Sequence, residues 1–166
     1  MFTPEILDLS WRLLLTAKQR GVKIVTAESC TGGLIAGALT SPAGASAVVE
    51  RGYVTYSNAA KTACLGVPAE VIARFGAVSA QVAGEMAQGA LAAGMERVLA
   101  LSVTGIAGPD GGSAGKPVGL VWFGRARAGS AHSVHRMYFA GDRAQIRLQA
   151  VRTGLELLLE GVEAWR

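Results

Sequence analysis

The sequence predicts an α/β fold, a three-layer α/β/α sandwich around a mixed sheet of about five strands. Short β-branched runs alternate with longer stretches of helical periodicity along most of the chain. This alternation is typical of a sheet covered by helices on both faces. The 166 residues suit one domain, and no linker, repeat or low-complexity segment divides them. We therefore expect a single domain over residues 1–166.

The first half of the chain begins with a helix. Thr3 is a typical N-cap and Pro4 a typical first helical residue, and Gly21 follows Arg20 as a stop signal. A β-branched run then predicts a buried strand over 22–27. The elements expected next are a helix over 34–39, a strand over 48–56, and short helices over 58–65 and 70–75.

The second half is expected to hold a helix over 79–93 and a buried strand over 98–103. Residues 104–117 contain five glycines and two prolines, so they cannot form regular structure. Strands over 118–126 and 133–139 follow, and Gly141-Asp142 precedes a last helix that reaches about Glu160. Because the loop between the last two strands is short, one strand is expected to be antiparallel.

Composition excludes several classes of protein. The formal net charge is +4, and the basic residues are scattered rather than clustered. A weak positive field suits an anionic small molecule, but it does not indicate nucleic acid as a partner. No apolar run approaches the roughly 20 residues that a membrane span needs, and no signal peptide is apparent. We therefore expect a cytoplasmic protein that contacts no membrane.

The metal-binding and histidine-dependent classes of site also lack support. Cys30 and Cys64 show no zinc-type spacing with each other or with the histidines. His132 and His135 are an odd number of residues apart, so they do not share a strand face. We expect free thiols, no metal site, and structural or exposed histidines.

A first candidate site lies over residues 29–33, between a predicted strand and a predicted helix. Ligands of open α/β sheets bind at such carboxyl ends of strands. Ser29 or Thr31 is an ordinary N-cap in one interpretation. Gly32 and Gly33 are poor helix formers, and they allow a ligand to approach the backbone. Cys30 is an alternative nucleophile, although a small buried cysteine is the commoner case.

A second candidate pairs Tyr56 with Lys61. Alternation places Tyr56 at the end of a strand, at the ligand edge of the sheet, and Lys61 near the start of the next helix. The dipole of that helix disfavours a protonated lysine, which helps a lysine that acts as a base. Taken alone, a single lysine on a short helix is more typical of a solvated surface residue.

The third and fourth candidates are the Gly-rich loop from Thr104 and the start of the last helix. Gly105 and Gly108 belong to a loop whose N–H groups can hold a phosphate or an oxyanion, or which is simply a long surface turn. It matches neither a Walker loop nor a dinucleotide fingerprint. Arg143 at a helix start suits a bound phosphate or carboxylate, unless Asp142 is only a cap and Arg143 is only exposed.

Taken together, these segments resemble the CinA C-terminal domain family over nearly the whole chain. The segments, in order, are Ala-Glu-Ser-Cys-Thr-Gly-Gly (27–33), Glu-Arg-Gly-Tyr-Val-Thr-Tyr-Ser-Asn-x-x-Lys (50–61), Leu-Gly-Val (65–67), Gly-Ala-Val-Ser (76–79), Thr-Gly-Ile-Ala-Gly-Pro-Asp-Gly-Gly (104–112), Lys-Pro-Val-Gly (116–119) and Gly-Asp-Arg (141–143). The resemblance is to the stand-alone form of the family. It implies deamidation of nicotinamide mononucleotide to nicotinate mononucleotide and ammonia, in pyridine nucleotide salvage, without a cofactor.

The resemblance also implies roles for residues. Ser29 is expected to be the nucleophile, Lys61 its base, and Tyr56 a residue that assists or orients them. The residues expected to bind the nucleotide substrate are Thr31, Gly32, Gly33, Thr104, Gly105, Gly108 and Arg143. The chemistry is coherent, because a serine needs a neighbouring base and a Ser–Lys pair needs no histidine. The oxyanion donors are expected among the N–H groups of residues 30–33 or of the loop from Gly105.

Two alternatives to the enzyme remain. The chain is alternatively a non-catalytic nucleotide-binding module with a regulatory role linked to competence or DNA damage. A nucleic-acid-associated protein is the third hypothesis, and it rests only on the family's competence label and the charge of +4. The small-residue helix over 79–93 and the apolar last helix are able to pack on a second copy, so a homodimer stays open.

Overall fold

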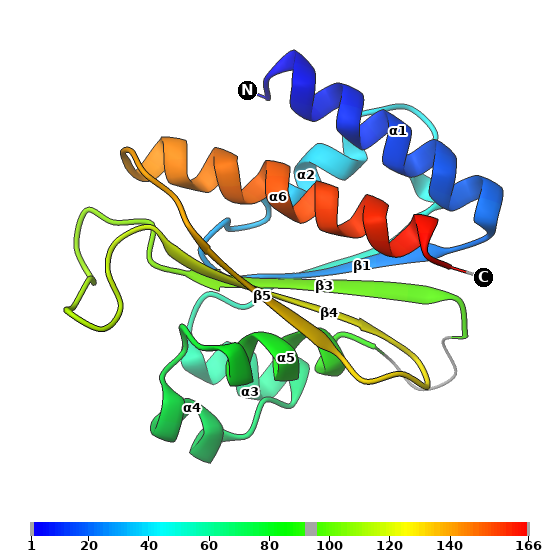
Figure 1. The fold of residues 1–166 in the computed structure, drawn as a ribbon. Helices are drawn as coiled ribbons and strands as arrows, with labels where there is room; N and C mark the ends of the chain where they lie inside the picture. Colours follow the sequence, from blue (N-terminus) through cyan, green and yellow to red (C-terminus); the bar gives the residue numbers. More distant parts are fainter. Residues whose placement is uncertain (1, 92–95, 166) are drawn as a thin grey trace.

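A computed structural model describes residues 2–91 and 96–165, and it shows a five-stranded sheet between two layers of helices (Figure 1). The helices are α1 (Pro4–Arg20), α2 (Leu34–Thr40), α3 (Asn58–Leu65), α4 (Ala69–Phe75), α5 (Ala80–Gly89) and α6 (Arg143–Glu163), with a 3-10 turn at Ala45–Ala47. The strands are β1 (Lys23–Glu28), β2 (Val49–Val54), β3 (Val98–Gly105), β4 (Leu120–Arg127) and β5 (Ser133–Tyr138). The predicted three-layer α/β/α fold with a mixed sheet is confirmed.

The sheet has the order β2-β1-β3-β4-β5. Strand β1 is parallel to β2 and β3, while β4 is antiparallel to both of its neighbours. The short β4–β5 connection accounts for this reversal, as the sequence predicted. The carboxyl ends of β1, β2 and β3 therefore meet at one edge of the sheet, where ligands of such folds bind.

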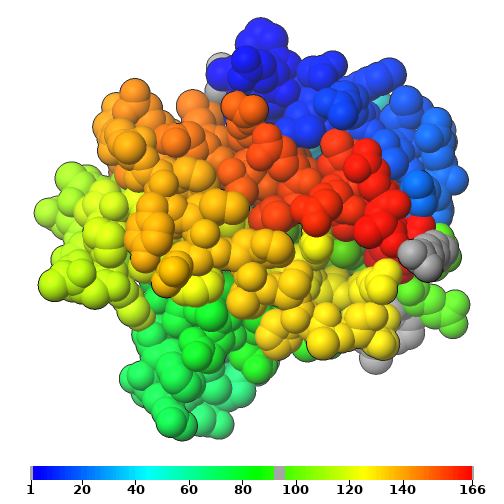
Figure 2. Space-filling model, viewed as in Figure 1, coloured from blue at the N-terminus to red at the C-terminus, as the bar shows by residue number. Residues whose placement is uncertain are grey.

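Each face of the sheet has its own apolar core. Helices α1, α2 and α6 cover one face, and α3, α4 and α5 cover the other (Figure 1). Leu13, Ile35 and Leu158 belong to the first core, while Val82 and Met86 belong to the second. In Figure 2 the yellow-to-orange β4–β5 hairpin lies between red α6 above and the green segment of α4 and α5 below. The hairpin therefore lies in the layer of the sheet, between the two layers of helices.

The capping residues fix the helix ends close to where the sequence placed them. The Thr3 side chain accepts from the Ile6 N–H, and Gly21 ends α1 in the left-handed conformation. Asp142 begins α6 with a complete capping box, although α6 runs on to Glu163 rather than stopping near Glu160. Of the helix predicted over 79–93, α5 forms Ala80–Gly89, and residues 92–93 lie outside the described residues.

The strand predicted over 48–56 is shorter than expected. Strand β2 ends at Val54, and Tyr56 lies in the connection to α3 rather than at a strand end. The reason is local: Ser57 accepts from the Ala60 N–H as the N-cap of α3, so the chain has to leave the sheet before it.

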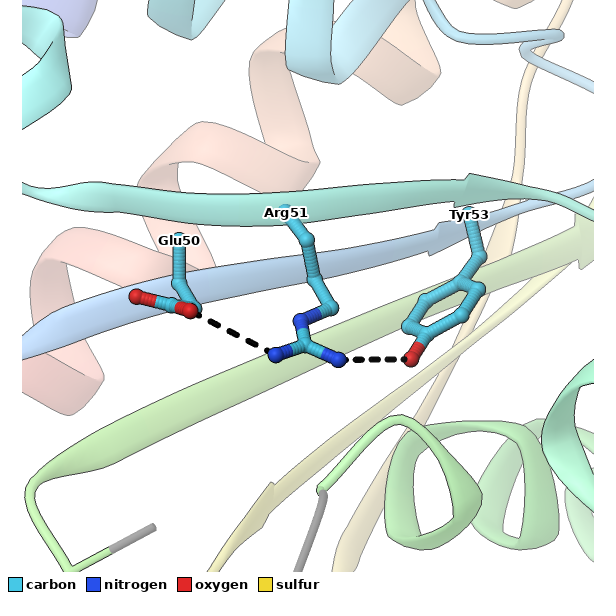
Figure 3. Close-up of polar contacts among 3 residues, drawn as sticks. All are labelled: Glu50, Arg51 and Tyr53. Atoms are coloured by element: carbon cyan, nitrogen blue, oxygen red, sulfur yellow. Dashed lines mark hydrogen bonds and ion pairs between the residues drawn. The ribbon is translucent and has the colours of Figure 1, made fainter.

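Strand β2 forms one edge of the sheet and carries polar side chains along it (Figure 3). Arg51 Nη2 lies 3.4 Å from Glu50 Oε1, and Arg51 Nη1 lies 3.4 Å from the Tyr53 hydroxyl. Charged side chains on an edge strand disfavour unwanted pairing with another strand.

None of the helices in the described part of the chain has the length and apolar character that a membrane span requires.

Candidate active site

Ser29 and Lys61 meet at the carboxyl edge of the sheet. Ser29 directly follows β1, and its N–H donates to the Val103 carbonyl of β3 at 3.0 Å, which fixes its backbone. Lys61 projects from α3, and its Nζ lies 2.9 Å from Ser29 Oγ. These two residues are 32 positions apart in the sequence, and the fold brings their polar atoms into hydrogen-bond contact.

The surroundings of Lys61 contradict its interpretation as a surface residue. Its side chain is 1% exposed, and Nζ also donates to the carbonyls of Thr55, at 2.8 Å, and Tyr56, at 3.3 Å. None of the ion pairs found among residues 2–91 and 96–165 involves Lys61. Desolvation by burial disfavours the charged amine, so it lowers the pKa of Lys61.

Glu28, which the sequence analysis did not single out, caps α2. Its Oε2 accepts from the Thr31 hydroxyl at 2.7 Å and from the N–H groups of Gly33 and Ile35 at 3.1 and 3.0 Å. Its Oε1 accepts from the Ala36 N–H at 2.8 Å. The N-cap interpretation of Ser29 and Thr31 is therefore wrong, because a buried carboxylate from β1 satisfies the helix N-terminus. The Ser29 hydroxyl is left free for Lys61.

We call residues Ser29–Gly33 the nucleophile turn. The Gly32 N–H donates to the Ser29 carbonyl, and the Gly33 N–H donates to Glu28. Gly32 and Gly33 have φ values of +61° and +91°, a conformation that favours glycine. Within the described residues, the N–H groups of Cys30 and Thr31 make no hydrogen bond inside the protein. Neither N–H is paired with another described residue, although Cys30 is 7% exposed and Thr31 is 0% exposed.

The alternative nucleophile, Cys30, is disfavoured by its environment. Burial raises the pKa of the Cys30 thiol to about 12, because a thiolate would lose its hydration. A cysteine acts as a nucleophile through its thiolate. At neutral pH the Cys30 side chain is therefore a buried, protonated thiol within the core under α6.

Helix α6 holds the nucleophile turn through Arg147, a second residue that the sequence analysis missed. Arg147 Nε donates to the Cys30 carbonyl at 3.2 Å, and Nη2 donates to the Thr31 carbonyl at 2.8 Å. These contacts join residues 117 and 116 positions apart in the sequence. The spacing of four from Arg143 was the available signal, because it places both side chains on one helix face.

Arg143 connects two other segments to α6. Its Nη1 donates to the Gly108 carbonyl at 2.9 Å, and its Nη2 lies 3.0 Å from the Tyr56 hydroxyl. Tyr56 thus meets Lys61 through its carbonyl and Arg143 through its phenol, whose ring is largely exposed. Within the described residues, the Tyr56 phenol makes no hydrogen bond with Ser29 or Lys61.

Thr104 and Gly105 occupy the end of β3, beside the same edge. The Thr104 side chain is buried, and its hydroxyl donates to the Ala77 carbonyl at 2.9 Å, which fastens the loop before α5. A Cβ on Gly105 would come within 2.8 Å of the Leu120 carbonyl oxygen on β4. Packing between strands is therefore enough to explain the glycine at 105. Gly108 contributes its carbonyl to Arg143.

The site is thus built from Ser29, Lys61 and the backbone of the nucleophile turn, with Arg143 and Arg147 behind them. In the described part of the chain, no group of three or more His, Cys, Asp or Glu residues is placed to hold a metal ion. What the geometry offers is a hydroxyl beside a buried amine, two unused N–H donors and a guanidinium. That set is suited to nucleophilic attack on a polar carbonyl carbon.

Comparisons with known proteins show similarity over most of the chain. The family described as the CinA C-terminal domain matches residues 8–162. The chain is 52% identical over 153 residues to the nicotinamide-nucleotide amidohydrolase PncC of Enterobacter agglomerans, with 92% of each chain covered. It is 49% identical over 158 residues to the protein of the same name from Escherichia coli K12, with 95% of each covered.

A solved structure is similar over almost the full length. The competence/damage inducible protein CihA from Agrobacterium tumefaciens superposes with a TM-score of 0.91 at 49% sequence identity, covering 98% of each chain. The fold and the length of the chain are thus shared with this relative.

Proposed function

The chain belongs to the CinA C-terminal domain family, and from this premise we propose that it is an amidohydrolase that converts nicotinamide mononucleotide to nicotinate mononucleotide and ammonia. The relatives named nicotinamide-nucleotide amidohydrolase are similar over nearly their whole length, which supports carrying that activity to this chain. The reaction would place the protein in pyridine nucleotide salvage.

One observation carries the proposal: the 2.9 Å contact between Ser29 Oγ and Lys61 Nζ. A serine hydroxyl is a weak nucleophile unless a base takes its proton. A neutral amine has two N–H donors and one lone pair. With two backbone carbonyls accepting from Nζ, the lone pair is left for the Ser29 hydroxyl to donate to. Burial without a carboxylate partner favours this neutral amine.

The reaction follows in two halves. Lys61 takes the proton of Ser29 as Oγ bonds to the carboxamide carbon of the substrate. The resulting tetrahedral intermediate collapses when the protonated Lys61 gives its proton to the amide nitrogen, the C–N bond breaks, and ammonia leaves. An ester between Ser29 and the nicotinoyl group remains. Water, deprotonated by the neutral Lys61, then attacks this ester, and the proton returns to Ser29 Oγ as nicotinate mononucleotide is released.

The negative oxygen of the intermediate needs donors, and we assign this role to the N–H groups of Cys30 and Thr31. Both follow the nucleophile directly, and the other N–H groups from Ser29 to Ala36 are already bonded inside the protein. A donor of this kind is worth roughly 3–4 kcal/mol of barrier in serine hydrolases.

The substrate phosphate is assigned to Arg143. The guanidinium has five N–H donors, and contacts to Gly108 and Tyr56 use two of them. Those contacts fix its position at the rim of the site, and the remaining donors suit a phosphate. In this proposal Tyr56 orients Arg143 through its phenol and Lys61 through its carbonyl.

The test is ammonia release from nicotinamide mononucleotide by the purified protein, compared with nicotinamide, its riboside and NAD. We expect turnover of the mononucleotide, its loss in Ser29→Ala and Lys61→Met, and retained binding of the mononucleotide in Ser29→Ala. The control is Cys64→Ala, because Cys64 is exposed and outside the site. Binding without turnover in the wild-type protein would instead favour a non-catalytic nucleotide-binding module.

A further inference from the structure

We propose that Arg147 is a positioning residue, which sets the direction of the Thr31 N–H, one of the two oxyanion-binding donors of the nucleophile turn. This inference rests on the proposed function, because it assigns a task within the same reaction. Arg147 is not itself required to touch the substrate. It acts through the two backbone carbonyls that it holds.

Arg147 binds two neighbouring backbone carbonyls at once. Arg147 reaches two consecutive carbonyls, those of Cys30 and Thr31, with two nitrogens of one planar guanidinium. A rigid fork that binds two acceptors fixes their relative orientation, and a single ammonium cannot do so in the same way. The side chain is half-buried, so its hydrogen bonds compete less with water than those of an exposed arginine.

The geometry of the peptide unit links each held carbonyl to the direction of the N–H that follows it. In a planar trans peptide the C=O and the following N–H point in opposite directions. Holding the Cys30 carbonyl toward α6 therefore turns the Thr31 N–H away from α6. The next peptide is held at both ends, because Thr31 C=O accepts from Arg147 and Gly32 N–H donates to the Ser29 carbonyl. Arg147 thus sets the direction of one of the two unused donors.

The nucleophile turn needs the restraint that Arg147 provides. Gly32 and Gly33 give this segment more backbone freedom than other residues would. Glu28 holds the turn at its far end, through Thr31 and Gly33. Arg147 holds the carbonyls in between. A Cβ on Gly32 would lie 3.3 Å from Arg147 Nη2, so the guanidinium sits directly against this glycine. Donors that are fixed before the reaction stabilise an oxyanion far better than donors that must reorient.

The experiment compares Arg147→Met and Arg147→Lys with the control Arg152→Met on the same helix. Arg152 is exposed and pairs only with Glu156 within the described residues, at 2.9 Å. We expect kcat to fall roughly ten- to a hundred-fold in Arg147→Met, with KM within about two-fold. Arg147→Lys is expected to recover little of kcat, because an ammonium lacks the planar fork that fixes the relative orientation of the two carbonyls. The control should keep its wild-type kcat.

Two further measurements separate positioning from a merely structural role. The first is the rate at which a fluorophosphonate modifies Ser29, a reaction that needs the oxyanion donors but no carboxamide. The second is the dissociation constant of nicotinate mononucleotide, which reports ground-state binding. Positioning predicts slower modification, by a factor similar to the loss in kcat, with unchanged product affinity in a folded variant.

The outcomes are distinct. Wild-type modification rates in Arg147→Met would overturn the role of Arg147, and so would a loss of product affinity as large as the loss of kcat. Failure of the wild-type protein to release ammonia would overturn the proposed function alone if modification of Ser29 still depended on Arg147. A wild-type protein that neither releases ammonia nor is modified at Ser29 would overturn both.

Discussion

At the scale of single residues, the unusual feature is a lysine that is 1% exposed and has carbonyls and a hydroxyl as its neighbours. A charged amine is costly to bury without a carboxylate partner, and the usual response is a lowered pKa. The buried amine lies at the carboxyl edge of the sheet, where the proposed reaction needs a neutral base. Groups with perturbed pKa values are often found at active sites.

The first prediction concerns the pH dependence of activity. The base has to be unprotonated, and burial lowers the pKa of Lys61. We expect kcat/KM to rise with pH through this lowered pKa and to level off above it, with the midpoint below the ordinary lysine value of about 10.4. A pH–rate profile of ammonia release measures this. A rate that falls with pH over the same range would contradict Lys61 as the base.

The second prediction concerns the pH dependence of stability. Because the pKa of Lys61 is lower in the folded state than in the unfolded chain, the unfolded chain binds more protons between these two values. The free energy of unfolding should therefore rise with pH in that window, relative to Lys61→Met. Below the folded pKa the lysine is protonated in both states, and the difference should be constant. Urea unfolding of both proteins across the window checks the sign, and equal slopes would refute it.

The third prediction concerns Glu28, whose two oxygens accept four hydrogen bonds. In Glu28→Gln the amide nitrogen must replace one oxygen and face at least one N–H donor. We expect unfolding to become easier by about 1–3 kcal/mol, together with lower kcat, because the nucleophile turn loses an anchor. Glu70→Gln, at an exposed position on α4, is the control for chemical denaturation. Equal stability of the two variants would contradict this account.

The sequence predicted the two residues whose side chains meet in the site and missed the residues that hold the nearby backbone. Ser29 follows a predicted strand and Lys61 lies near the start of a predicted helix, and both stand in motifs of the family that the chain resembles. Glu28 and Arg147 act largely through contacts with backbone groups. Almost every residue has the same backbone groups, so such contacts leave no recognisable pattern in the sequence. Glu28 lay just outside the strand predicted over 22–27, and its partners lie up to eight positions further along the chain.

At the scale of elements, helix α6 links the parts of the site. Arg143 and Arg147 lie one turn apart in its first two turns, and between them they reach the nucleophile turn, the Gly-rich loop and Tyr56. The limits of the helices were predictable because capping is local, as with Thr3 and Asp142. The end of β2 was missed although the start of α3 was predicted, because the strand expected over 48–56 ran up to the N-cap Ser57 and left no residues for the connection.

The fourth prediction tests the close packing of α5 on β4. A Cβ on Gly124 would overlap the Ala83 carbonyl of α5 and come within 2.6 Å of Ser102 Oγ. Gly124→Ala should therefore destabilise the protein by about 1–3 kcal/mol, the usual cost of overpacking. Gly115→Ala is the matched control, because a Cβ there meets nothing within 4 Å. Thermal unfolding of the two variants checks the difference, and similar melting temperatures would contradict it.

At the scale of the whole molecule, both helical layers contribute to one edge of the sheet. Lys61 comes from the layer of α3 to α5, Arg143 and Arg147 come from the opposite layer, and Ser29 comes from the sheet itself. Alternating elements predicted the three layers, and the short loop between the last two strands predicted the antiparallel strand. They did not predict the strand order, which is set by packing between segments distant in the sequence. Only this order brings the four residues together.

The opposite end of α6 should matter for stability and not for chemistry. Trp165 is 8% exposed, contacts Arg97 and Arg127 through its ring, and accepts from Arg20 through its carbonyl. At 21 residues, α6 is about 30 Å long, so this cluster lies far from Ser29. Trp165→Ala should therefore cost about 3–5 kcal/mol of unfolding free energy, the usual loss for a buried tryptophan.

The same variant should keep its wild-type kcat at temperatures where it stays folded. Arg147→Met should instead lose kcat and keep its stability. Trp11→Ala is the matched control, because that ring is 55% exposed, and its removal should change stability by less than about 0.5 kcal/mol. Chemical denaturation and ammonia release, measured on all three variants, test the separation. A loss of kcat in folded Trp165→Ala would mean that α6 transmits strain along its length, and that the two ends of the sheet are not independent.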